Sequence, residues 1–98
     1  MLQFKDKKVL VTGGSRGIGE SIAVAFARGG ARVAINYRAN EKAAASCVRK
    51  LTGKGHIALQ ADIADPAQAE LLVEKAIEGL GGLNIVVNNA GIWLSHPI

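Results

Sequence analysis

A glycine-rich segment close to the N-terminus has the composition of a phosphate-binding loop. Residues 12–19 read Thr-Gly-Gly-Ser-Arg-Gly-Ile-Gly and lie between an apolar run and a stretch with helical periodicity. Glycines allow a tight turn and a close approach of the backbone to a ligand. The start of the helix adds unpaired N–H groups and a dipole that attracts negative charge. The residues predicted to bind phosphate are Gly13, Gly14, Ser15, Arg16, Gly17, Ile18 and Gly19.

The segments that must position this loop alternate between strand and helix. Short apolar runs predict strands at 9–11, 32–37, 56–61 and 83–88. Apolar residues recur at helical spacing between these strands, and glycines end each helical stretch. Strands joined by helices of this length pair in parallel with right-handed crossovers. The chain is therefore predicted to be an α/β protein, with a Rossmann-type doubly wound parallel sheet of order 3-2-1-4.

Two of the predicted helices carry recognisable N-terminal caps. Asn40 precedes the second helix, and its side chain can accept from the free N–H groups of the first turn. Asp65 and Pro66 open the third helix, with Gln68 at the reciprocal position of a capping box. The predicted apolar face of the third helix is made of Ala69, Leu72, Val73, Ala76, Ile77 and Leu80.

Three sequence elements together resemble the signatures of the short-chain dehydrogenase/reductase family. The first is Thr-Gly-x-x-x-Gly-x-Gly at residues 12–19, and the second is Asn-Asn-Ala-Gly at residues 88–91. The third is Asp62, which follows the third strand and precedes Ile63. The resemblance covers essentially the whole chain. Within the family, the sequence resembles the 3-oxoacyl-acyl-carrier-protein reductase branch.

The resemblance implies roles for residues beyond the glycine loop. Asp62 would accept from the adenine amino group, helped by the Ile63 backbone, although Asp is also common as a turn or cap residue. Asn88 would tie strands together, whereas Asn89 would face the cofactor, and these two roles could be exchanged. The residues expected along the ribose and nicotinamide are Asn89, Ala90 and Gly91.

The end of the second strand decides between NAD and NADP in a dinucleotide site. A carboxylate there binds the ribose 2′-hydroxyl and repels a 2′-phosphate. The position falls at Tyr37, where no acid stands, and Arg38 follows directly. The resemblance implies that Arg16 and Arg38 straddle the 2′-phosphate, a role for which the planar guanidinium is suited. We therefore expect NADP(H) as the cofactor, although Arg38 taken alone could be a solvated charge at a strand end.

The groups that perform chemistry in the family are absent from this sequence. Family members transfer a hydride between NADPH and a carbonyl or alcohol, with the tyrosine of Tyr-x-x-x-Lys as the acid. Tyr37 is the only tyrosine, and Glu41 stands four residues later. We predict no catalytic residue, and expect residues 1–98 to be a single partial domain, truncated after the fourth strand and inactive alone. A stand-alone nucleotide-binding module, or a half-enzyme completed by another chain, stays open as an alternative.

A rival motif occupies the same residues. Residues 13–17 match Gly-x-Ser-x-Gly, the nucleophile elbow of serine hydrolases, which also requires a strand, a turn and a helix. Ser15, then Asp62 or Asp65, then His96 even follow the hydrolase order. The hydrolase interpretation is the weaker one, because an elbow usually follows several strands and no oxyanion-loop motif is present.

The composition indicates which binding partners and which cellular compartment to expect. Hydrophobic residues make up 49% of the chain, which indicates a folded domain. The net charge of +4 comes from scattered residues, so no nucleic-acid surface is expected. No apolar run approaches the roughly 18 residues of a membrane helix. The single cysteine, Cys47, suits a reducing cytoplasm. The two histidines, His56 and His96, are far apart in the sequence and have no further metal-ligating residues beside them, so no metal site is expected.

The predicted topology leaves one surface incomplete. The first two helices cover one face of the sheet, and only the third covers the other. The fourth strand would then be an open apolar edge. We expect self-association at this surface, or docking of a complementary chain.

Overall fold

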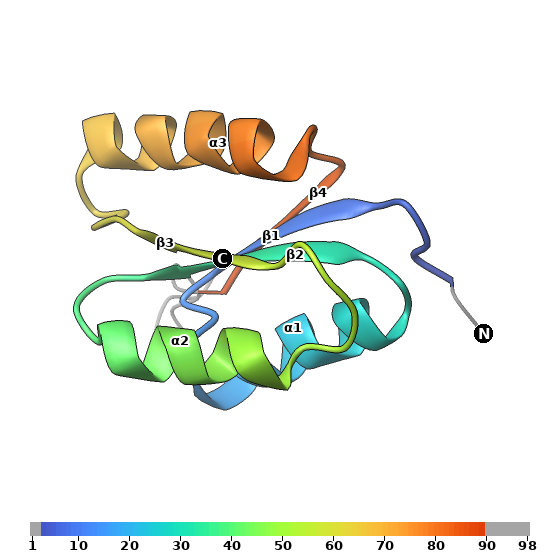
Figure 1. Ribbon diagram of the computed structural model, residues 1–98. Coiled ribbons are helices and arrows are strands. Elements are labelled where there is room, and N and C mark those ends of the chain that lie inside the picture. Colours follow the sequence, from blue (N-terminus) through green and yellow to red (C-terminus); the bar gives the residue numbers. More distant parts are fainter. Residues whose placement is uncertain (1–2, 90–98) are drawn as a thin grey trace, which may run out of the picture.

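A computed structural model describes residues 3–89; Ala90, Gly91 and His96 therefore lie outside the described part of the chain. Four strands pair in parallel in the order β3-β2-β1-β4, which confirms the predicted Rossmann-type topology (Figure 1). The strands are β1 (Lys8–Thr12), β2 (Arg32–Tyr37), β3 (Ile57–Gln60) and β4 (Ile85–Asn88). The helices are α1 (Gly17–Arg28), α2 (Glu41–Lys50) and α3 (Pro66–Leu80).

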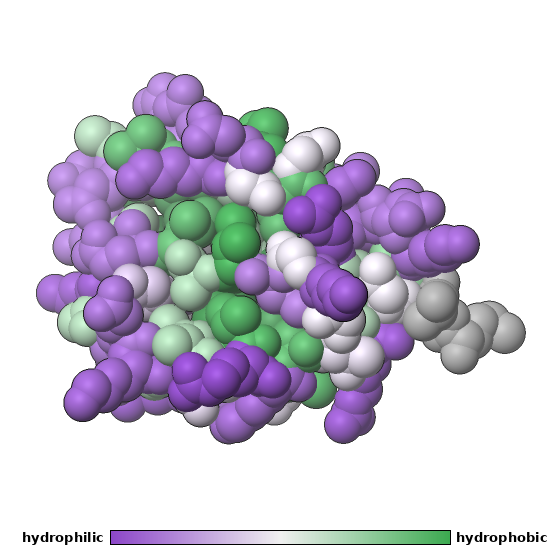
Figure 2. Space-filling view, viewed as in Figure 1, coloured by the Kyte–Doolittle hydropathy of each residue, from purple (hydrophilic) through white to green (hydrophobic). Residues whose placement is uncertain are grey.

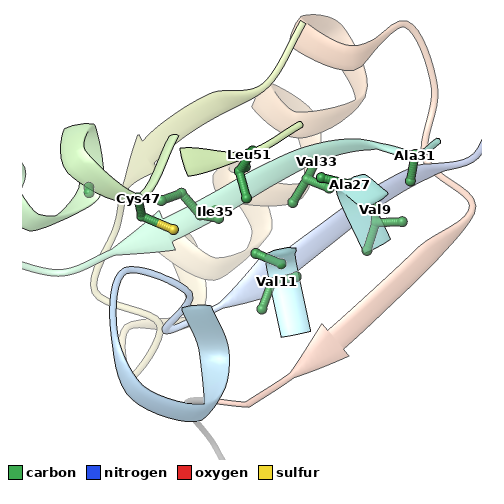
Figure 3. Packing of buried hydrophobic residues seen from close by; sticks show 10 residues of the cluster. Val9, Val11, Ala27, Ala31, Val33, Ile35, Cys47 and Leu51 are labelled. Carbon is green, nitrogen blue, oxygen red and sulfur yellow. The ribbon is translucent and has the colours of Figure 1, made fainter. Parts of the chain in front are cut away.

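The sheet is sandwiched between two helical layers, with α1 and α2 on one face and α3 on the other (Figure 1). Side chains alternate along each strand, so Val9 and Val11 face α1 and α2, whereas Leu10 faces α3. Figure 3 shows the first core, where Ile35 of β2 lies beside Cys47 of α2. The second core is smaller and consists of Leu10, Ala34, Ala61, Leu72, Ala76 and Leu80.

Two strands begin later than predicted, and a side chain bonds to the neighbouring strand just before each of them. The imidazole Nδ1 of His56 accepts from the backbone N–H of Val33 at 3.1 Å, and β3 begins one residue later. The Asn84 side chain accepts from the backbone N–H of Lys8 at 2.8 Å, and β4 begins at Ile85. Side-chain bonds of this kind compete with a sheet ladder and end it locally.

The caps of α2 and α3 form largely as predicted. Asn40 Oδ1 accepts from the backbone N–H of Ala43, and Asp65 Oδ1 accepts from that of Ala67, both at 2.9 Å. Gln68 departs from the capping box, because its Oε1 accepts from the backbone N–H of Asp62 at 2.8 Å. The Asp65 N–H instead donates to the Asp62 carbonyl. The start of α3 is thereby tied to the loop that follows β3.

The face covered by α3 is partly open. Leu72, Ala76 and Leu80 are buried, but Val73 and Ile77 of the predicted apolar stripe are 36% and 46% exposed. Val86 of β4 is 51% exposed and pairs in register with the buried Leu10. A hollow of about 210 Å³ lies between α3 and β4. Apolar surface is also seen in the band between α3 and α2, with hydrophilic side chains over both helices (Figure 2).

Candidate nucleotide-binding site

The glycine loop connects the end of β1 to the start of α1 at the carboxyl edge of the sheet. Gly13 and Gly17 have φ of 62° and 63°, a conformation that a residue with a Cβ rarely adopts. A Cβ on Gly19 would lie 2.1 Å from the carbonyl oxygen of Gly13, so the loop closes tightly onto the helix. Arg16 is the N-cap of α1 and makes no side-chain cap hydrogen bond. The N–H groups of the first turn therefore stay available for an anion.

Four hydrogen bonds from other elements hold the loop in place. Asn36 of β2 accepts from the Gly13 N–H through Oδ1 at 3.2 Å and from the Gly14 N–H through its carbonyl at 3.0 Å. The amide of Asn89 donates to the Gly13 carbonyl at 3.2 Å. The thiol of Cys47 donates to the Gly14 carbonyl at 3.4 Å. The loop is thus held by β2, by α2 and by the residue that follows β4.

Arg16 and Arg38 come together at one hollow beside the loop. The hollow measures about 440 Å³, and Tyr37 lines it with both arginines. Both arginine side chains are exposed, and neither forms an ion pair with a residue in the 3–89 range. No carboxylate lines the hollow, and its remaining walls are Gly13, Ser15, Ala39 and Asn40. The arrangement offers two free guanidinium groups to an anion of phosphate size.

Ile18 stands at the mouth of the glycine loop and is 73% exposed. It is the second residue of α1, where side chains project away from the sheet rather than into the core. The core gives no reason for an isoleucine at this place. A contact with an apolar part of a ligand would supply one.

Asp62 and Ile63 follow β3 at the same edge of the sheet. Asp62 Oδ1 accepts from the Ala64 N–H at 3.0 Å, so the carboxylate closes a local turn, as the alternative interpretation expects. This bond occupies one carboxylate oxygen and leaves the adenine role as a prediction. The Ile63 side chain packs against the second core.

Both asparagines at the end of β4, the last strand residue Asn88 and the following Asn89, join elements. The Thr12 hydroxyl donates to Asn88 Oδ1 at 3.2 Å and to the Val87 carbonyl at 3.3 Å, which links β1 to β4. Asn89 is bonded to the glycine loop, as described above. Asn88 therefore joins strands as expected, and Asn89 has a structural bond in addition to any contact with a cofactor.

Three residues that support the site were not predicted to belong to it from the sequence. Asn36, Cys47 and Thr12 all bond to the glycine loop or to its flanking strands. For Asn36 a signal was available, because it is a polar residue inside the apolar run of a predicted buried strand, and such residues need hydrogen-bond partners. Cys47 is fully buried, so its thiol bonds to the glycine loop from within the core.

Other potential sites find no support in the part of the chain that is described. Both imidazole nitrogens of His56 are bonded to backbone groups, those of Val33 and Thr52. Within residues 3–89, no group of three metal-ligating side chains comes together. None of the described helices is long and apolar enough to cross a membrane. The hydrolase interpretation depends on His96, which lies outside the described residues.

Burial raises the pKa of the Cys47 thiol above its ordinary value of 9.0, and the nearby Glu20 carboxylate raises this pKa further. The folded chain therefore keeps a proton that the unfolded chain loses above about pH 9. We expect the free energy of unfolding to fall as pH rises through this range, by at most about 1.4 kcal/mol per pH unit. Urea denaturation at pH 7 to 10 measures the slope, and Cys47→Ser should flatten it. Equal slopes in the two chains would contradict this origin.

The comparisons with known proteins identify the family. A family model described as short chain dehydrogenase matches residues 7–98, and the chain belongs to this family of oxidoreductases. It is 44% identical to the L-rhamnose 1-dehydrogenase (NAD(P)+) of a Sphingomonas species, over 98% of this chain and 39% of the relative. It is 41% identical to the 3-oxoacyl-acyl-carrier-protein reductase of Staphylococcus aureus, over 88% of this chain and 36% of the relative.

Solved structures agree with the fold. A short-chain dehydrogenase from Burkholderia cenocepacia, crystallised in complex with NADP, superposes with a TM-score of 0.85 at 44% identity. The match covers 98% of this chain and 40% of that one. The chain thus spans about two fifths of the length of the relatives it matches.

Proposed function

We propose that this chain is the NADP(H)-binding part of a short-chain dehydrogenase/reductase. The observation that carries the proposal is the hollow beside the glycine loop, which holds two unpaired arginines and no carboxylate. A carboxylate at this place would bind the NAD ribose and repel a 2′-phosphate, whereas arginines attract that phosphate. The NADP complex of the Burkholderia structure supports the same cofactor.

Four parts of the chain would share the binding of the cofactor. The N–H groups of residues 17–19 and the glycine backbone would hold the pyrophosphate, because they lie at the start of α1, where no side chain caps the helix. Gly19 packs so closely on the Gly13 carbonyl that a side chain at position 19 would displace this backbone. Arg16 and Arg38 would hold the 2′-phosphate, with Tyr37 beside them. The loop at Asp62 and Ile63 would face the adenine, while Asn89, Ala90 and Gly91 would lie toward the ribose and nicotinamide. Bound NADPH would supply the hydride that reduces a carbonyl group.

The acid for this reaction is not provided by Tyr37. This single tyrosine lines the arginine hollow, at the adenosine end of the proposed site. Glu41, and not a lysine, stands four residues after it, so the lysine that activates the tyrosine in the family's Tyr-x-x-x-Lys motif is absent from this position. We therefore expect the 98-residue chain to bind NADPH without oxidising it when a ketone is added.

Calorimetric titration of the purified chain tests the proposed cofactor. NADPH should bind at least tenfold more tightly than NADH, since two charged hydrogen-bonding groups meet the 2′-phosphate. The absorbance of NADPH at 340 nm, followed with a panel of ketones, tests the expected absence of turnover. A folded chain that binds neither nucleotide would refute the proposal, and ketone-dependent oxidation of NADPH would refute the part that concerns catalysis.

The open face between α3 and β4 favours a second component. Val73, Ile77 and Val86 are exposed beside a hollow that Leu10 and Leu72 line. Exposed apolar side chains of this size forfeit about 1.5–3 kcal/mol each while they stay in water. We propose that further polypeptide, or a second copy of the chain, covers this face in the active protein. A reducing compartment such as the cytoplasm would suit the single free thiol of Cys47.

A further inference from the structure

A single buried amide, the side chain of Asn36, lies between the two loops that the proposed site needs. Asn36 is 2% exposed and stands near the end of β2, between β1 and β3. β1 ends at Thr12 and β3 ends at Gln60, but backbone bonds to β2 continue beyond both ends, because the Gly14 N–H donates to the Asn36 carbonyl and the Ala61 N–H to the Tyr37 carbonyl. The Gly13 N–H and the Ala61 carbonyl are satisfied instead by a side chain.

The Asn36 amide supplies these partners in both directions. Its Oδ1 accepts from the N–H of Gly13, the first glycine of the loop, at 3.2 Å. Its Nδ2 donates to the carbonyl of Ala61 at 3.1 Å and to that of Leu59 at 3.3 Å. Gly13 begins the proposed phosphate cradle, and Ala61 directly precedes Asp62. One side chain thus connects the cradle to the loop proposed to face adenine.

The chemistry of this position requires a carboxamide. Only a group with an acceptor and a donor on one planar end can serve the N–H on one side and the carbonyls on the other. An aspartate would keep the acceptor but would bring its negative charge to the carbonyl oxygens of Ala61, Leu59 and Tyr37, which all accept from the Asn36 amide. An alanine would leave the buried N–H and carbonyl groups without this partner.

We propose that Asn36 is a positioning residue that sets the spacing between the phosphate cradle and the adenine loop. The inference rests on the proposed function, because it assigns the spacing to an adenosine phosphate. A ligand that touches both loops depends on the spacing. A ligand that occupies the cradle alone does not, since Asn89, Cys47 and the Asn36 backbone also hold the glycine loop.

The test compares two probes on the full chain: adenosine 2′,5′-bisphosphate, which spans both loops, and inorganic pyrophosphate, which fits the cradle. Asn36→Asp should weaken binding of adenosine 2′,5′-bisphosphate at least tenfold and that of pyrophosphate less than threefold. Leu80→Val is the matched control, because it alters a buried residue at the far end of α3. The control should change neither affinity more than twofold. Unchanged affinity for both probes in Asn36→Asp, or an equal loss for both, would overturn the proposal.

A measurement on the unaltered chain keeps the proposal testable if the variant does not fold. The side-chain NH₂ resonances of Asn36 should be protected from exchange and should shift when adenosine 2′,5′-bisphosphate binds. Rapid exchange, or no shift at saturation, would contradict the proposed coupling. If the unaltered chain binds neither probe, the proposed function fails as well. If the unaltered chain binds both probes, and Asn36→Asp binds each of them as tightly as the unaltered chain does, only the role of Asn36 is refuted.

Discussion

Replacing Arg38 with alanine is expected to weaken NADPH binding about tenfold, and replacing Arg16 as well should bring the loss to between tenfold and about a thousandfold. NADH binding should change less than threefold, because NADH has no 2′-phosphate for these side chains to contact. The lower end of the range applies if solvent screens the two exposed guanidinium groups. Isothermal titration calorimetry with both nucleotides measures the difference.

Arg28→Ala is the matched control for the arginine variants. Arg28 lies in the last turn of α1, at the opposite end of the helix from the glycine loop. Its loss lowers the positive charge of the chain by the same amount, so it corrects for long-range attraction of the nucleotide. Equal losses of NADPH and NADH affinity in Arg38→Ala would contradict a contact with the 2′-phosphate. If Arg28→Ala lost as much NADPH affinity as Arg38→Ala, the effect would come from the net charge of the chain and not from a contact with the 2′-phosphate.

Replacing Gly19 with alanine should abolish measurable NADPH binding, with a loss of at least about a hundredfold. The new Cβ would lie 2.1 Å from the Gly13 carbonyl oxygen and 2.8 Å from Asn89 Nδ2. Backbone must move to relieve such a contact, and overpacking of this kind typically costs about 1–3 kcal/mol of stability. The movement would also shift the N–H groups proposed to contact the pyrophosphate. Nucleotide titration and thermal unfolding of the same sample separate the two effects.

Gly79→Ala provides the control for this substitution. Its Cβ would meet Ile57 Cδ1 at 2.5 Å, but that atom is the far end of a flexible side chain. Alanine also has a higher helix propensity than glycine, by about 1 kcal/mol, so the two effects should nearly cancel. Stability and NADPH affinity should both stay close to those of the unaltered chain. Retention of NADPH binding by Gly19→Ala would show that the loop is not the close-packed cradle proposed.

The fold could be predicted because its signals are local and repeated. The apolar runs, the helical periodicity and the glycine stops each specify one element, and parallel pairing then follows from the helical connections. The first residues of β3 and β4 could not be predicted, because His56 and Asn84 bond there to strands that are distant in sequence. The exposure of Val73 and Ile77 likewise depends on how far α3 extends over the sheet, which periodicity does not reveal.

The candidate site could be predicted only in part, because some of its contacts join residues that are distant in the sequence. The glycine loop and the two arginines are recognisable from residue type and spacing, and the structure brings them to one hollow. The bonds that fix the loop come from Asn36, Cys47 and Asn89, which stand 23, 33 and 76 positions from their partners. Sequence alone marks Asn36 only as a polar residue in an apolar strand. Its role becomes visible once β1, β2 and β3 lie side by side.

The most direct test of the central claim is to map the binding of NADPH onto the backbone amides of the isotopically labelled chain by NMR. The account predicts that the largest shifts occur at residues 13–19, at Arg38, and at Asp62 and Ile63. Amides of Gly53, Lys54 and the last turn of α3, at the opposite edge of the sheet, should not move. Shifts that centre on that opposite edge, or on the hollow between α3 and β4, would contradict the assignment of the glycine loop as the phosphate site.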